Sequence, residues 1–198
     1  AWAGRGPRPT PLGLQLVFTL GLARSPARAD LLRRYWDAQF AADKAVGAVD
    51  MAGAERDLKW LVPALVNALG SERVAFLEGQ GNWQPAVREA CLGALARAMG
   101  QGRDRDEVVR ALAKARSLPV TSRTTLLLGL QQGLRQAGSS LAREAGAPVV
   151  QAFLREALTN ATLPGLTLHA YEDGRLAAIR LLGLSDQPEA RSNLTWIA

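Results

Sequence analysis

The 198-residue chain contains one cysteine, Cys91, and one histidine, His169. A single cysteine excludes an intrachain disulfide, a CxxCH haem attachment and zinc sites built from paired cysteines. A single histidine excludes a multi-histidine metal site, while a catalytic role beside Tyr171, Glu172 and Asp173 stays formally open. We interpret that group as a polar loop leading into a helix. Cys91 falls on the apolar side of a predicted helix, where cysteine behaves as a small hydrophobe, so we expect a core thiol.

Glycine-rich phosphate loops are also missing. Neither G-x-x-x-x-G-K nor G-x-G-x-x-G occurs, and the G-Q-G-N stretch at residues 79–82 has neither a preceding strand nor a lysine. Glu172 and Asp173 are neighbours in sequence, so on a helix they would not face one another as an acid/base pair. We therefore assign no catalytic, cofactor-binding or metal-binding residue and expect this segment not to be an enzyme.

Long apolar runs are lacking as well. The longest, LGLQLVFTLGLA at residues 12–23, is too short to span a bilayer. Arg5 and Arg8 precede it and Ala-Arg-Ala follows, so residues 12–29 can be interpreted as a signal peptide or as a packed helix. The frame L-x-x-[VI]-x-x-LGL-x-x-x-P, found at residues 14–26, recurs at 176–188, where no targeting signal could lie. This recurrence favours the packed helix.

Concentrated positive charge is absent although the net charge is +6 and the pI is about 10.4. The 21 Arg and three Lys are scattered, the longest basic run is the pair at 33–34, and many have an acidic neighbour, as in RDRDE at 103–107. Phosphate binding needs a concentrated basic surface, so this pattern argues against a nucleic-acid partner. The sequons at Asn160 and Asn193 are short enough to arise by chance.

What the chain does have is Ala, Leu and helical periodicity. Apolar residues recur at helical spacing and nowhere alternate with polar ones, so we predict eight or nine amphipathic helices and no strand. The predicted stripes are Leu31, Leu32, Tyr35, Trp36 and Phe40; Leu58, Leu61, Val62, Leu65, Val66 and Leu69; Val87, Cys91, Ala94, Leu95 and Ala98; Val108, Val109 and Leu112; Leu126, Leu127, Leu130 and Leu134; Val149, Val150, Phe153, Leu154, Ala157 and Leu158; and Leu176, Ile179 and Leu182.

Glycine and proline positions predict where these helices begin and end. The expected boundaries are a loop over residues 47–53, a kink or a fresh first turn at Pro63, a C-terminal stop at Gly70, a first turn at Pro85, a stop at Gly100, an N-cap at Thr121 and helix starts at Pro148 and Pro188. Each boundary residue lies at the edge of an apolar stripe or, at Pro63, inside one.

Five tryptophans are present. Trp36 and Trp60 lie near apolar stripes and are expected in the core, whereas Trp2 and Trp196 lie near the ends. Trp83 stands between polar residues just before a predicted helix. It is the best candidate for an exposed contact residue, and packing against a neighbouring repeat is the alternative.

The two copies of the repeated phrase are 162 residues apart, and similar stripes between them mark four units averaging about 40 residues. We predict an all-α fold, a right-handed α-solenoid of HEAT/armadillo-like helix pairs over residues 1–198, with a compact irregular helical bundle as the alternative. Ala90, Ala94 and Ala98 would let adjacent helices approach closely. We expect the segment to belong to a longer multidomain protein.

Residues 87–95, VREACLGAL, resemble the second-helix pattern V-R-x-x-A-x-x-A-L of HEAT repeats. LQLVFTLG, LLLGLQQGLRQ and RLAAIRLLGL, in that order, resemble the HEAT-type region of planctomycete-type membrane-bound dehydrogenase or haem-binding CxxCH proteins. The resemblance implies a non-catalytic scaffold in an extracytoplasmic, periplasmic redox protein. It also implies a propeller-type dehydrogenase module and a c-type haem elsewhere in the chain, and partners that are other modules or proteins. The alternative is a stand-alone HEAT-like nucleic-acid-binding or base-repair module.

Overall fold

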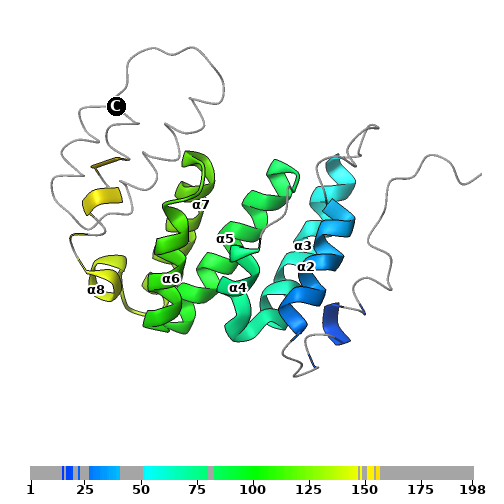
Figure 1. Cartoon of the computed structure of the whole chain (residues 1–198), viewed down its shortest axis with the longest axis horizontal. Coiled ribbons are helices and arrows are strands. Elements are labelled where there is room, and N and C mark those ends of the chain that lie inside the picture. Colours follow the sequence, from blue (N-terminus) through cyan, green and yellow to red (C-terminus); the bar gives the residue numbers. More distant parts are fainter. Residues whose placement is uncertain are drawn as a thin grey trace, which may run out of the picture. The chain divides into compact units, whose positions relative to one another are not determined.

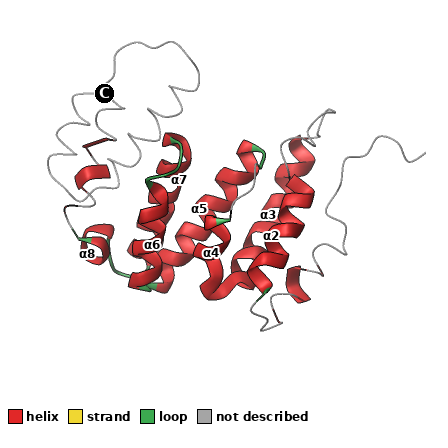
Figure 2. Cartoon of the chain, viewed as in Figure 1, coloured by secondary structure: helices red, strands yellow, loops and turns green. Residues whose placement is uncertain are grey.

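The computed structural model describes residues 15, 17–19, 22, 27–40, 51–79, 83–146, 148, 151–153 and 155–156. Every regular element within these ranges is a helix, and none of them is a strand (Figure 2). The prediction of an all-α fold is confirmed at this level. By contact density the chain divides into two compact units, residues 1–95 and residues 96–198. One continuous segment over residues 1–198 stays a prediction.

The first unit contains α2 (Arg28–Phe40), α3 (Met51–Leu69), the short 3₁₀ helix η2 (Gly70–Glu72), α4 (Arg73–Glu78) and the start of α5 (Pro85–Gly102). In Figure 1, α2 and α3 lie side by side as blue and cyan ribbons, and α4 also contacts both of them. All six stripe residues predicted between Leu58 and Leu69 are buried, so the core-facing side of α3 is confirmed.

Pro63 neither begins a new helix nor lies in a loop. It lies inside α3, which continues from Met51 to Leu69, so a fresh first turn at Pro63 is wrong. Proline has no N–H to donate to the carbonyl of Lys59, four residues earlier. Lys59 and Pro63 are both exposed, so this carbonyl is open to water. The expected loop is also too long, because α3 already begins at Met51.

Gly70 ends α3 as expected, with φ at +53°, a value that glycine tolerates better than any other residue. The chain then continues through η2 and α4, which no apolar stripe had predicted. The short α4 nevertheless buries Val74, Phe76 and Leu77.

α5 begins at Pro85, which confirms the first-turn prediction, because proline needs no N–H donor there. Its end is two residues later than predicted, at Gly102 instead of Gly100. Ala94 and Ala98 are only half-buried, whereas Leu92, Ala96 and Met99 are fully buried. Val87, Cys91 and Leu95 of the predicted stripe are buried as expected, so the buried face of α5 includes most of that stripe and extends beyond it.

The second unit contains the end of α5, α6 (Arg105–Ala115), α7 (Val120–Gln136) and α8 (Leu141–Ala145), followed by helical residues at 148, 151–153 and 155–156. α6 packs against both α7 and α8. The stripe of Leu126, Leu127, Leu130 and Leu134 is buried, as predicted.

Side-chain caps set the turns of this unit. Asp104 caps α6 by accepting from the N–H groups of Asp106 (3.0 Å) and Glu107 (3.3 Å), and Ser140 caps α8 by accepting from Arg143. Thr121 does not cap α7; the helix begins at Val120 behind Pro119, so the predicted N-cap is wrong. The fixed φ of Pro119 already places the chain for helix entry.

Two predicted core residues lie at the surface. Leu31 is 42% exposed and Val109 is 46% exposed, because Leu32 and Val108 beside them take the inward position. Neighbours on a helix are about 100° apart, and on α2 and α6 the buried face is wide enough for only one residue of each pair. On α3 it is wider, because the neighbours Leu61 and Val62 are both buried there.

Several predictions lie outside the described residues. These are the second copy of the repeated phrase at 176–188, the helix start at Pro188, Trp2, Trp196, His169, Glu172, Asp173 and the sequons at Asn160 and Asn193. In the first copy, Val17 is helical and fully buried, while Phe18 and Leu22 are exposed.

Candidate functional site

Trp83 is buried in the core of the first unit. It is 1% exposed, packs on Phe76 (ring centroids 5.5 Å apart) and lies near Trp36 (6.4 Å), so its prediction as an exposed contact is wrong. Its indole N–H donates to the Asp37 carboxylate of α2. This bond satisfies the polar end of the side chain, which is why a tryptophan among polar neighbours can be buried.

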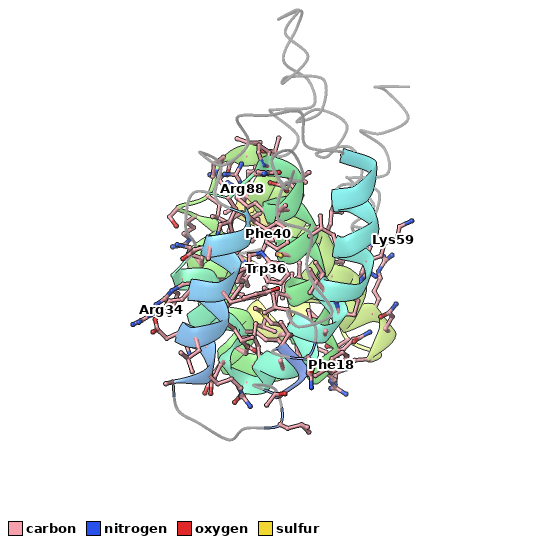
Figure 3. All side chains as sticks on the ribbon, turned by 90° about the vertical axis from the view of Figure 1, so that its right-hand side faces the viewer. Phe18, Arg34, Trp36, Phe40, Lys59 and Arg88 are labelled. Atoms are coloured by element: carbon pink, nitrogen blue, oxygen red, sulfur yellow. The ribbon has the colours of Figure 1, made fainter. Side chains whose placement is uncertain are left out.

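Trp36 is confirmed as a core residue and extends this aromatic cluster to Phe40, with ring centroids 4.9 Å apart. Figure 3 shows Trp36 and Phe40 inside the first unit, whereas Arg34 and Lys59 point outward. The backbone N–H of Gln84 donates to the Phe40 carbonyl (3.1 Å), which ties the start of α5 to the end of α2. The side chain of Trp60 lies outside the described part.

Cys91 is a free, fully buried thiol, as predicted. Burial raises its pKa far above the usual range because the thiolate would lose its hydration, and the neighbouring Trp36 indole offsets only a small part of this effect. A thiol held protonated is a poor nucleophile and a poor metal ligand. The group therefore contributes packing rather than chemistry.

A second polar contact joins α2 to η2. Arg28 donates to the Leu69 carbonyl (2.9 Å) and to Glu72 (3.3 Å), and Glu72 also accepts from the Ala29 N–H (2.9 Å). The carboxylate thus lies at the N-terminus of α2, where the helix dipole favours negative charge. This contact joins the start of α2 to the end of α3 and to η2.

A very close helix contact in the second unit involves two glycines. A Cβ on Gly100 of α5 would lie 2.5 Å from the Leu130 carbonyl oxygen and 2.7 Å from the Leu134 nitrogen of α7. A Cβ on Gly133 would overlap the Arg97 carbonyl oxygen. Backbone therefore meets backbone here. The predicted close approach exists, but glycine provides it instead of Ala90, Ala94 and Ala98.

Side chains beside the glycines fix the register. Arg97 donates to Gln132 (2.9 Å) and Gln101 donates to Gln136 (2.6 Å), and in both pairs the partners are 35 residues apart. The second bond lies one helical turn further along both helices than the first, and the sequence separation is the same in each. The two helices therefore run parallel at this contact. Since α6 connects them, it returns in the opposite direction.

The helix starts show the same spacing. α7 begins 35 residues after α5, at Val120 against Pro85, and α8 begins 36 residues after α6, at Leu141 against Arg105. Helix starts in this part of the chain thus recur after about 35 residues, a spacing shorter than the average of about 40 expected from the stripes.

Arginines in the described part serve largely as internal donors. Arg123 of α7 donates to the carbonyls of Ala115 (3.1 Å) and Leu118 (3.0 Å) after α6, and it pairs with Glu156. Arg105 similarly donates to the Glu144 carbonyl (3.2 Å). Backbone carbonyls at helix ends are unsatisfied acceptors, so such arginines hold helix junctions together.

Within the residues that the structure describes, no group of three or more His, Cys, Asp or Glu side chains is placed to hold a metal ion. Among the same residues, no helix is long and apolar enough to cross a membrane.

Comparison with known proteins returned no family model, no curated protein and no solved structure that matches the chain.

Proposed function

We propose that this chain is a non-catalytic scaffold whose helix pairs form a right-handed α-solenoid. The observation that carries the proposal is the parallel contact of α5 and α7, with Gly100 and Gly133 at its centre and two hydrogen bonds at a constant offset of 35 residues. A helix pair cannot bury its apolar face alone, so equivalent helices stack with a constant sequence offset. The surface that results suits binding of proteins better than chemistry.

The redox setting rests on sequence resemblance. We propose that the scaffold holds a dehydrogenase module and a c-type haem module of one extracytoplasmic protein in a fixed relation. The buried, protonated Cys91 takes no part in electron transfer in this proposal. All redox chemistry belongs to modules outside these 198 residues.

A stand-alone nucleic-acid-binding or base-repair module is the alternative. The arginine contacts weigh against it, because Arg28 and Arg123 bind carbonyls and carboxylates of their own unit. Guanidinium groups engaged in this way are poorly placed to neutralise phosphates.

The coding sequence on both sides of this segment tests the redox setting. A propeller-type module upstream and a CxxCH motif downstream would support it, and the lack of both would refute it. The scaffold role is tested in the parent protein by Gly133→Ala, with Gly102→Ala on the exposed end of α5 as the matched control. We expect Gly133→Ala to slow transfer between the modules while each module's own activity stays unchanged. Equal transfer in both variants would contradict the scaffold role.

A further inference from the structure

We draw no further inference here: the strongest candidate, the exposed apolar surface patch of Phe18 and Leu22 in the helical residues that precede α2, carries none because nothing in the described part of the chain shows what covers it.

Discussion

Gly100 of α5 and Gly133 of α7 face each other so closely that neither position has room for a side chain. Each missing Cβ would meet backbone atoms of the opposite helix, at 2.5 Å from the Leu130 carbonyl oxygen in the case of Gly100. Backbone atoms cannot move aside as a flexible side chain can. The contact therefore determines how closely the end of α5 and α7 approach each other within the second unit.

Gly133→Ala is expected to destabilise the chain. The added methyl group overlaps the Arg97 carbonyl, and forcing the helices apart costs about 1–3 kcal/mol even though alanine is the better helix former. Urea unfolding monitored by circular dichroism measures the change. Gly102→Ala, at the exposed end of α5, makes the same chemical change without the clash and should be neutral or slightly stabilising. Equal stability of the two variants would contradict the close contact.

Asp37→Ala should reveal the role of the bond to Trp83. The change leaves a buried indole N–H without its acceptor, which costs about 1–3 kcal/mol in the free energy of unfolding. Asp37→Asn keeps an acceptor oxygen at the same place and should cost clearly less. Thermal or urea unfolding of the two variants makes the comparison. If they are equally stable, hydrogen bonding does not explain how Trp83 is buried.

The buried thiol predicts a dependence of stability on pH. Burial raises the pKa of Cys91 in the folded state, while in the unfolded chain it ionises near pH 8.5, about the usual thiol value. Below that pH both states are protonated and the thiol adds no pH dependence. Above it only the unfolded state loses the proton, so stability falls by about 1.4 kcal/mol per pH unit.

Comparing the chain with Cys91→Ala isolates this contribution. Above about pH 8.5, the free energy of unfolding of the unchanged chain should fall, relative to that of Cys91→Ala, by about 1.4 kcal/mol per pH unit. In the native state the thiol should also react with an aromatic disulfide reagent only as fast as the protein unfolds. Rapid labelling of the folded chain would show that Cys91 is accessible, against the burial described above.

Arg123→Lys is expected to weaken the junction after α6. Lysine keeps the charge but lacks the planar guanidinium with which arginine donates to the Ala115 and Leu118 carbonyls at the same time. We therefore expect the free energy of unfolding to fall by about 1–3 kcal/mol. Arg116→Lys, at an exposed position, should change stability by less than about 0.5 kcal/mol. Similar effects of the two substitutions would show that Arg123 is not a structural donor.

Helical periodicity predicts which side of a helix is buried, but it contains no information about partners far away in the sequence. The α3 and α7 stripes were predictable because all of their residues are buried, including neighbours such as Leu65 and Val66. Leu31 and Val109 were misplaced because periodicity does not tell how wide the buried face of a helix is, and on α2 and α6 that face takes only one residue of the adjacent pair. Trp83 was misplaced because its partner, Asp37, is 46 residues away, and no local pattern contains that bond.

The sequence predicts that a close helix contact exists on α5, but not which residues form it. Small residues on α5 suggested a close approach, and the alanines were chosen because they lie on the expected stripe. Gly100 was assigned instead to the end of the helix, because glycine is common there. Its actual role depends on the backbone of α7, a partner more than 30 residues away in sequence.

The parallel stacking of α5 and α7 can be tested most directly by a nuclear Overhauser experiment on the two glycines. With assigned, glycine-labelled protein, we expect a cross-peak between the Hα protons of Gly100 and Gly133, together with contacts from Arg97 to Gln132 and from Gln101 to Gln136. A folded, helical protein that lacks the Gly100–Gly133 cross-peak, or that pairs Arg97 with Gln136 instead, would contradict the helix-pair stack.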